Sequence, residues 1–167
     1  MSTDIEKLVR DAVKEIVKSQ NEPTHNKKYI EYISLSDARF LASKVEEKAR
    51  EMGVNAVVAI SDDGGNLKLC ECMDNSYLAS RDIAINKAYT VVALKMSTAK
   101  LAGLARPEGP LYGIQHTNGG RIVIFGGGDT LELRGKILGG LGVSGGSAEQ
   151  DTALSAYGKK VFEEYFS

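Results

Sequence analysis

The chain has 167 residues, of which 43% are hydrophobic, and its formal net charge is −1. This length and composition predict one domain with a single core and a short appendage. Acidic and basic residues are interspersed, which excludes the basic cluster typical of a nucleic-acid-binding protein, and no run of about 18 apolar residues predicts a membrane span. A secretory signal is also missing, so we expect a cytoplasmic protein with neither a nucleic acid nor a membrane as partner.

The first 20 residues predict a detached amphipathic helix. Thr3 and Glu6 form a capping box, and the apolar residues that follow recur on one helical face: Ile5, Leu8, Val9, Ala12, Val13, Ile16 and Val17. Residues 21–33, which include Pro23 in a polar stretch, predict a flexible linker. We expect the apolar face of the helix to be buried on a separate partner, on the chain's own domain or on a copy of the chain.

The remaining residues, 34–167, predict one domain in which helices and strands alternate. Ser34 and Asp37 mark the start of its first helix, which stops at Gly53, and Ser80 or Asp82 marks the start of its second. Short connections allow neighbouring strands to pair in the antiparallel sense, so we predict an α+β fold with an antiparallel sheet of about five strands flanked by helices. The expected strands are 54–61, 66–74, 111–114, 121–125 and 137–144. The expected later helices are 83–97, a short turn at 98–104, and a last helix with Leu154, Tyr157, Val161 and Tyr165 on one face.

A run of glycines between Phe125 and Asp151 is the most informative feature of the sequence. Glycine in regular structure costs about 0.5–1 kcal/mol relative to alanine, so the run indicates unusual backbone angles or a close approach of the main chain to another group. Three familiar motifs fit only in part. A dinucleotide-binding fold needs a second strand after Gly145, a nucleophile elbow needs a histidine after Ser144, and a phosphate loop needs a hydroxyl where Ile137 stands.

A second capping box, formed by Ser147 and Gln150, predicts that a helix starts directly after this run. The unpaired N–H groups of such a helix start can bind an anion. Ser144, Gly145 and Gly146 are therefore candidate ligands for a carboxylate or phosphate. The alternative is that they only connect a strand to a helix.

Cys70 and Cys72 stand two residues apart on a predicted strand and therefore point to the same face. This spacing suits neither a disulfide framework nor, alone, a four-ligand zinc site, and we expect two buried small hydrophobic side chains. A role as soft metal ligands would require Met73 or a histidine beside them.

Several stretches within residues 35–166 resemble the GlcG/HbpS family, which also occurs as the C-terminal domain of PduO. The matching stretches are Leu35-Ser36-Asp37-Ala38, residues 63–67, Met73-Asp74, residues 83–88, and residues 139–146 followed by Gln150-Asp151. The family usually has two glycines, an aliphatic residue and a proline after its penultimate strand, whereas this chain has residues 126–131 in place of that turn.

This resemblance implies a five-stranded antiparallel sheet flanked by helices, assembly into homo-oligomers, and binding of haem or a related tetrapyrrole. Residues 1–20 are similar to the short peptides that deliver cargo to bacterial microcompartments, where PduO-type proteins serve cobalamin-dependent diol metabolism. The two likenesses together imply an accessory protein in the microcompartment lumen. Its partners would be shell or cargo proteins bound through residues 1–20, and cobalamin is a second candidate cofactor.

If haem is bound, His25 in the linker and His116 in a loop are the candidate axial ligands of its iron. Arg81 and Lys87 on the second helix could pair with propionate or phosphate groups, and the alternative is that both are ordinary solvated helix charges. Asp151, in the first turn of the last helix, favours the helix dipole.

Three functions are consistent with these residues. The first, which we expect, is a non-enzymatic module that binds a tetrapyrrole through the glycine-rich corner and a histidine. The second is an enzyme acting on a small carboxylate or a corrinoid cofactor, with Lys87 and Ser144 near the chemistry, but no matched acid–base pair is visible there. The third is a structural multimer that anchors neighbouring proteins through residues 5–17.

Overall fold

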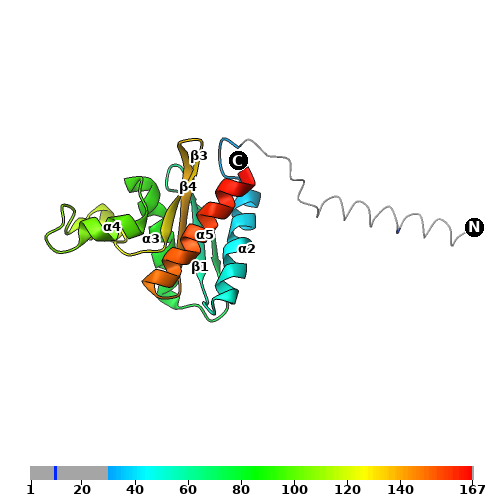
Figure 1. Cartoon of the computed structure of the whole chain (residues 1–167), viewed down its shortest axis with the longest axis horizontal. Helices are drawn as coiled ribbons and strands as arrows, with labels where there is room; N and C mark the ends of the chain where they lie inside the picture. Colours follow the sequence, from blue (N-terminus) through cyan, green and yellow to red (C-terminus); the bar gives the residue numbers. More distant parts are fainter. Residues whose placement is uncertain (1–9, 11–29, 167) are drawn as a thin grey trace, which may run out of the picture.

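The computed structural model of the protein describes residue 10 and residues 30–166 (Figure 1). Apart from Arg10, the predicted N-terminal helix and the linker up to residue 29, His25 included, lie outside the described residues. The helices are α2 (Leu35–Glu51), α3 (Leu78–Leu94), α4 (Thr98–Ala105), the 3-10 turns η1 (Ile114–His116) and η2 (Asn118–Gly120), and α5 (Ala148–Phe166). The strands are β1 (Val57–Asp62), β2 (Leu67–Cys72), β3 (Gly128–Leu133) and β4 (Lys136–Ser144).

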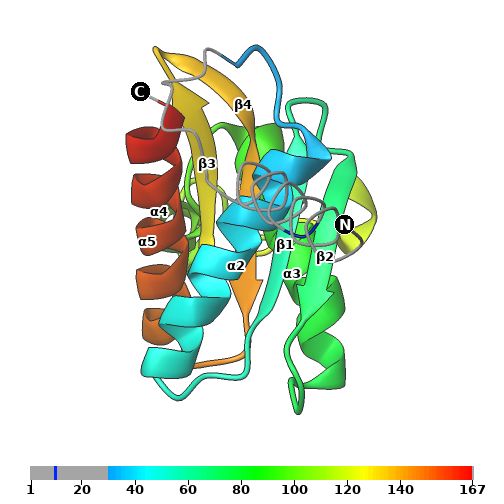
Figure 2. The same cartoon turned by 90° about the vertical axis from the view of Figure 1, so that its right-hand side faces the viewer.

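The four strands form one sheet in the order β2-β1-β4-β3, and every neighbouring pair is antiparallel. Successive residues of a strand point to opposite faces. Val58 and Ile60 of β1 therefore enter the core shared with α2 and α5, whereas Val57 and Ala59 face α3. The result is three layers, with α2 and α5 side by side over one face of the sheet and α3 over the other (Figure 2).

Helix α2 begins at the predicted capping box. The Ser34 hydroxyl accepts a hydrogen bond from the Asp37 N–H at 3.2 Å, and the Asp37 carboxylate accepts one from the Ser34 N–H at 3.0 Å. Near this end of α2, the ring of Phe40 stacks on Tyr165 near the end of α5, with 4.1 Å between the ring centroids. The two helices consequently run antiparallel and close the larger core from one side.

Two segments at the edge of this core pack in ways that local patterns did not reveal. Ile30 and Ile33, which belong to the predicted linker, are only 7% and 1% exposed and lie in the core, so the packed subunit extends back at least to Ile30. On α5, Leu154 is buried as predicted, but the buried face continues through Phe162 and Phe166, one position beyond the expected residues.

The prediction of about five strands is wrong by one, because the described residues contain four. Residues 111–113 lie in a turn that leads into η1 at Ile114, and the Leu111 N–H donates to the Leu104 carbonyl at 3.0 Å. Residues 121–125 also form no strand: the Val123 N–H donates to the Thr90 hydroxyl of α3 at 3.0 Å in place of a strand partner. Strand β3, at one edge of the sheet, begins inside the glycine-rich segment that stands in this chain where the family usually has a turn.

The two cysteines lie on β2, at the other edge of the sheet. Across the β1–β2 ladder, Cys70 stands opposite Ala59 and Cys72 opposite Val57, so both side chains lie on the α3 face of the sheet. The prediction that both are buried is wrong, because Cys70 is only half-buried and Cys72 is exposed.

Helix α3 begins five residues earlier than expected, at Leu78. Its N-cap residue is Tyr77, which makes no side-chain capping bond, so neither Ser80 nor Asp82 is the cap. Ser80 instead lies in the first turn and is buried against the sheet. Helix α4 agrees closely with the short helical turn predicted at residues 98–104.

Candidate functional site

Helix α3 lies directly on the bare backbone of β4. A β-carbon at Gly142 would be 2.0 Å from the carbonyl oxygen of Ala84, and a β-carbon at Gly140 would be 2.2 Å from that of Ala88. Only glycine permits such a distance between a strand and a helix backbone. The close approach expected at this run of glycines is therefore made by a helix of the same subunit.

This close packing encloses an ion pair between α3 and α5. The Lys87 side chain has no exposed surface, and its Nζ lies 2.8 Å from Oδ2 of Asp151 and donates to the carbonyl oxygen of Val143 at 2.7 Å. The second carboxylate oxygen, Asp151 Oδ1, accepts a hydrogen bond from the Gly146 N–H at 2.9 Å. Two side chains thus connect α3, β4 and the first turn of α5.

The space around the Lys87 ammonium group is closed by a glycine and an aromatic ring. Gly127 has a φ of 112°, and a β-carbon there would lie 2.6 Å from the Lys87 Nζ. The Phe125 ring centroid is 4.9 Å from the same nitrogen, which permits a cation–π interaction. Burial lowers the pKa of Lys87, while the hydrogen bond and charge of Asp151 oppose that effect. The ammonium group is therefore neutralised inside the subunit and does not face a solvent-accessible site.

The three residues predicted to hold an anion meet at this same corner, but their groups face inward. Ser144 is buried and its hydroxyl donates to the Ser80 hydroxyl at 3.2 Å. A β-carbon at Gly145 would lie 2.4 Å from a backbone carbonyl oxygen of the loop before β1. The predicted capping box is present with both of its hydrogen bonds. The anion bound near this helix start, through the Gly146 N–H, is the chain's own Asp151 carboxylate.

Local patterns do not predict the partnership of Lys87 and Asp151, which are 64 residues apart. From the sequence, Asp151 is expected only to favour the helix dipole, and Lys87 is a candidate ligand-binding group or an ordinary solvated helix charge. The sequence nevertheless contains a signal that Lys87 is buried, because this lysine shares its helical face with Ala84, Ala88 and Val91. A lysine on an apolar face needs a buried partner, and a carboxylate beside a glycine-rich strand was available.

The other predicted site residues lie outside this corner. The Arg81 side chain is 60% exposed and forms an ion pair with Asp82 at 3.3 Å. His116 is exposed at the end of η1, with its Nε2 3.3 Å from the amide nitrogen of Gln115. Over the described part of the chain, the Gln115 Oε1 is the buried side-chain polar atom that has no hydrogen-bond partner. His25 lies outside the described residues, so the structure does not place it.

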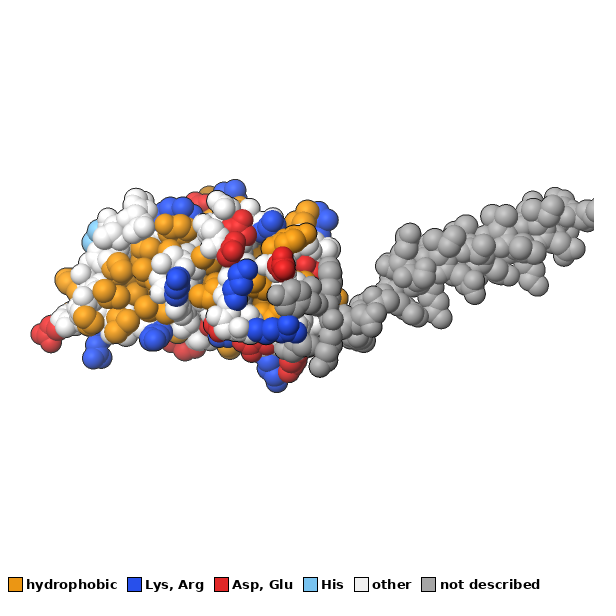
Figure 3. All heavy atoms as spheres, turned by 90° about the horizontal axis from the view of Figure 1, so that it is seen from above, with side chains coloured by type: hydrophobic (Ala, Val, Ile, Leu, Met, Phe, Trp, Pro, Cys, Tyr) orange, Lys and Arg blue, Asp and Glu red, His pale blue; other side chains and the backbone are white. Residues whose placement is uncertain are grey.

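Apolar side chains gather at the α4 end, which we define as α4 together with residues 106–121 (Figure 3). Tyr112 is 67% exposed there, and its partly exposed apolar neighbours in the sequence are Leu104, Leu111 and Ile114. The Arg121 guanidinium carbon lies 3.7 Å from the ring centroid of Tyr89. His116 belongs to the same stretch. An imidazole can bind haem iron, and a guanidinium can bind a propionate, so this surface has the groups that a tetrapyrrole requires.

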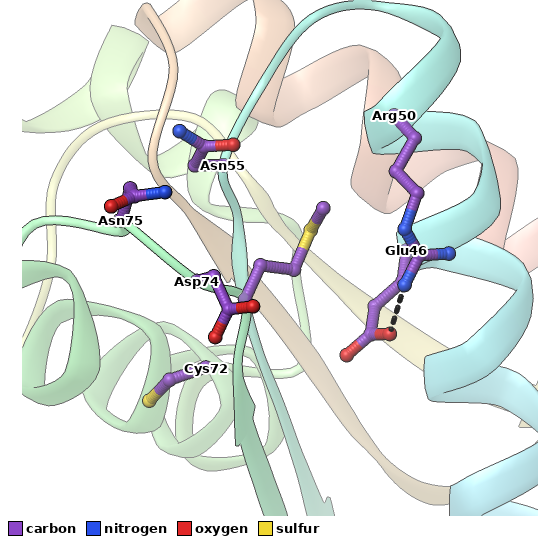
Figure 4. Close-up of a pocket in the computed structure, with 7 residues that line it drawn as sticks. Glu46, Arg50, Asn55, Cys72, Asp74 and Asn75 are labelled. Atoms are coloured by element: carbon purple, nitrogen blue, oxygen red, sulfur yellow. Dashed lines mark hydrogen bonds and ion pairs between the residues drawn. The ribbon is translucent and has the colours of Figure 1, made fainter.

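A pocket of about 420 Å³ opens between α2 and the segment that follows β2 (Figure 4). Glu46 and Arg50 of α2 form an ion pair across 3.1 Å on one side of it. The sulfur of Met73 accepts the Ala56 N–H at 3.3 Å, and Cys72 points away from the ion pair. The full lining is Glu46, Arg50, Asn55, Cys72, Met73, Asp74 and Asn75. This polar lining suits a small hydrophilic molecule better than a flat apolar one.

Two further properties concern the described residues as a whole. They contain no group of three or more His, Cys, Asp or Glu side chains arranged to hold a metal ion. A haem iron, which the porphyrin itself holds, needs only one or two protein ligands and is not subject to that limit. In the part of the chain that is described, no helix is both long and apolar enough to cross a bilayer.

The fold and the site define a class of protein: a small α+β subunit with a four-stranded antiparallel sheet, a buried lysine–aspartate pair at a glycine-rich corner, and an apolar end that carries a histidine. The sequence model of the family described as "Haem degrading protein HbpS-like" matches residues 33–159. The chain belongs to this family, which confirms the resemblance seen in the sequence.

Comparison with individual proteins supports this membership. An uncharacterised 15.0 kDa protein from the dhaT-dhaS intergenic region of Citrobacter freundii is 44% identical over 132 residues, covering 79% of this chain and 93% of the relative. The corrinoid adenosyltransferase PduO of Salmonella typhimurium is 37% identical over 135 residues, covering 80% of this chain but 40% of PduO. The solved structure of PduOC in complex with haem is 36% identical with a TM-score of 0.74, covering 77% of this chain and 94% of PduOC.

Proposed function

We propose that this protein is a non-enzymatic accessory subunit that binds haem or a related tetrapyrrole. The observation that carries this proposal is its likeness to PduOC, a protein solved with haem, at 36% identity over 94% of the PduOC chain. Because this chain matches only 40% of the length of PduO, the adenosyltransferase activity named for the whole of that enzyme is not part of the proposal. A cofactor-binding role needs no catalytic residues, and none is assigned.

We place the ligand at the surface of the α4 end, with His116 as an axial ligand of the iron. This location is supported by the exposure of His116 and Tyr112 and by the partly exposed apolar side chains of the same stretch. The guanidinium of Arg121, which lies over the Tyr89 ring, is at the end of that stretch. His25 is proposed as an alternative or second axial ligand on sequence grounds. Arg81 is exposed and remains a candidate partner of a propionate.

Lys87, Ser144, Gly145 and Gly146 take an indirect part in this proposal. Their polar groups or backbone atoms are already engaged within the subunit, so they shape the glycine-rich corner and hold α3 and α5 in place. The same burial weakens the alternative of an enzyme that acts on a small carboxylate or corrinoid through Lys87 and Ser144.

Titration of the purified full chain with haem tests this function. The wild type should show a Soret band distinct from that of unbound haem. The band should shift or disappear in the variant, His116→Ala or His25→Ala, that removes the axial ligand, and in the double variant. Lys160→Ala is the matched control, because that side chain is 71% exposed on α5. An unchanged spectrum on haem addition, or unchanged binding by the double variant, would contradict the proposal. Titration with cobalamin in parallel tests the second candidate cofactor.

We also propose that the protein is microcompartment cargo linked to cobalamin-dependent diol metabolism, and that residues 1–20 bind a shell or cargo protein. The support is the apolar face of that segment in the sequence and the likeness to PduO. Replacing Val9 and Val13 by aspartate should abolish association with isolated microcompartments. Replacing Lys7 and Lys14 on the polar face by alanine should not. Equal association of both variants would overturn this assignment.

A homo-oligomer is the third part of the proposal. Leu78 is 93% exposed and Tyr77 is 72% exposed at the start of α3, and adjacent exposed apolar side chains are typical of a protein interface. If the subunits meet there, Leu78→Asp should reduce the mass measured by sedimentation equilibrium. If the mass stays unchanged, the contact lies elsewhere, and a monomeric wild type would exclude the structural multimer altogether.

A further inference from the structure

Arg121, the last residue of the α4 end, is an exposed positive charge that is held in place without a carboxylate partner. Its guanidinium carbon lies 3.7 Å from the ring centroid of Tyr89, which is the contact distance of two stacked planar groups. A stacked guanidinium keeps its N–H donors at its edge, where they can still bind an anion. Among the described residues, no carboxylate forms an ion pair with Arg121, whereas Arg50 and Arg81 each have one.

The Tyr89 ring on which Arg121 lies is itself fixed from two sides. Its phenol oxygen accepts a hydrogen bond from Asn118 Nδ2 at 3.3 Å. Gly65, in the hairpin between β1 and β2, has a φ of 74°, and a β-carbon there would lie only 3.1 Å from Cδ2 of the ring. The backbone of the hairpin therefore limits how far the ring can move away from Arg121.

The backbone at Arg121 is also anchored. Its N–H donates to the Asn118 carbonyl at 3.4 Å, and its carbonyl oxygen lies 3.3 Å from the hydroxyl of Thr90, a fully buried residue of α3. A side chain that is already ordered loses less conformational entropy when it binds a ligand. Arg121 is therefore better prepared for an anion than Arg81, whose charge is paired with Asp82.

A carboxylate of the proposed ligand fits this arrangement. A guanidinium binds a carboxylate through two parallel N–H···O bonds, and haem carries two propionate carboxylates. Arg121 follows His116 by only five residues, and the chain between them includes the end of η1 and the turn η2. Because 3-10 turns rise about 2 Å per residue, the two backbones are roughly 10 Å apart or less. One tetrapyrrole can therefore contact both side chains.

We propose that Arg121 binds a carboxylate of the tetrapyrrole and that Tyr89 is a positioning residue that holds the guanidinium for this contact. The subunit would then select a tetrapyrrole with free carboxylates over the same ring with neutral ester groups. This inference rests on the proposed function, because it names the ligand group that one residue of the same surface recognises. No covalent step is involved.

Titration of the full chain with haem and with its dimethyl ester, followed by the Soret band, tests this selection. The wild type should bind haem about 10-fold more tightly than the ester, because the ester cannot form the charge-assisted pair. Arg121→Gln should lose about 10-fold in affinity for haem and little for the ester, so that the preference disappears. Arg50→Gln is the matched control, since it removes the same charge from α2, on the opposite face of the sheet.

Two further variants separate the position of the guanidinium from its charge. Tyr89→Leu keeps the charge of Arg121 but removes the ring beneath it, so it should reduce the preference for haem over the ester. Arg121→Lys keeps a positive charge without the planar fork and should retain only part of that preference. Thermal unfolding of each variant distinguishes a lost contact from a lost fold.

The possible failures differ from one another. Equal affinity of the wild type for haem and its ester, or an equal loss for both ligands in Arg121→Gln, would overturn this inference while leaving the tetrapyrrole function in place. A full preference for haem in folded Tyr89→Leu would overturn the positioning role of the ring. Absence of binding to either ligand would overturn the tetrapyrrole function and this inference together.

Discussion

Lys87 and Asp151 show at the scale of single residues how strongly a buried charge depends on its partner. Removing one member of a buried ion pair typically costs about 3–5 kcal/mol, whereas replacing both with apolar groups of similar size costs much less. We expect Lys87→Met and Asp151→Leu each to lower the free energy of unfolding by about 3 kcal/mol or more, and the double variant to recover much of that loss. Urea unfolding of the four proteins measures the coupling.

The control for this cycle is an ion pair at the surface. Lys160 and Glu164 lie 3.6 Å apart with side chains 71% and 66% exposed, so Lys160→Met should change stability little. If the losses of the two buried variants simply added in the double variant, the two side chains would not act as a pair.

Asp129 provides a prediction about pH. Burial raises the pKa of its carboxyl group, while the Ser155 hydroxyl, which donates to Oδ2 at 2.7 Å, and the charge of Lys159 lower it. Because the pKa is raised, the carboxyl group of Asp129 stays protonated in the folded state at pH values where it is already ionised in the unfolded state. The protonated group contributes fully to the stability of the fold below about pH 3.9, the ordinary pKa of aspartate. That contribution is lost as pH rises through the folded-state pKa.

Asp129→Asn should therefore stabilise the protein at neutral pH, because the amide can still accept the Ser155 hydrogen bond without carrying a charge. The gain should shrink as pH falls towards about 3, where the wild-type carboxyl group is protonated in both states. Thermal unfolding of the two proteins across this pH range measures the difference. A gain that is the same at every pH would show that ionisation of Asp129 is not its cause.

At the scale of elements, the contact between α3 and β4 depends on the absence of side chains. Gly142→Ala would place a methyl group 2.0 Å from the Ala84 carbonyl oxygen, which is backbone and cannot move without the helix. We expect a loss of about 2 kcal/mol or more in the free energy of unfolding, since overpacking commonly costs about 1–3 kcal/mol even where side chains can adjust.

Gly103→Ala is the matched comparison, because it is the same chemical change on a helix with open space around it. No atom lies within 4 Å of a β-carbon at Gly103 in α4, and its φ is not positive. This variant should be as stable as the wild type or more stable by up to about 1 kcal/mol, through the higher helix propensity of alanine. Similar losses in both variants would contradict a specific role for the glycines of β4.

Helices and strands could be predicted where the signal is local. The capping boxes at Ser34 and Ser147 were found because a helix start is encoded by residues three positions apart. Residues 121–125 predict a strand because the four residues after Arg121 are apolar, but the hydroxyl of Thr90, on a distant helix, binds the backbone there. The edge strand β3 was missed because its glycines indicate a turn when read without their neighbours.

At the scale of the whole molecule, the start of the packed subunit can be located by truncation. Ile33 is 1% exposed in the main core and Ile30 is 7% exposed beside it. Deleting residues 1–29 should leave the unfolding transition unchanged, because both isoleucines remain. Deleting residues 1–33 removes both and should cost about 2 kcal/mol or more, the usual effect of emptying a large buried apolar site.

Urea unfolding of the two truncated proteins is the direct comparison. Destabilisation by the shorter deletion would mean that residues 1–29 contribute to the stability of the core. Equal stability of both truncated proteins would mean that the core closes without the two isoleucines, contrary to their burial.

Sequence alone determined the α+β class, the family, most helix starts and the presence of an unusual glycine-rich backbone, because each of these follows from residue types and short spacings. Only the tertiary structure decided that α3 packs on the backbone of the β4 glycines, that Lys87 pairs with Asp151, and that Cys72 is exposed on an edge strand. The physical reason is that these contacts join residues far apart in the chain, and their partners depend on how the helices pack on the sheet rather than on any local pattern.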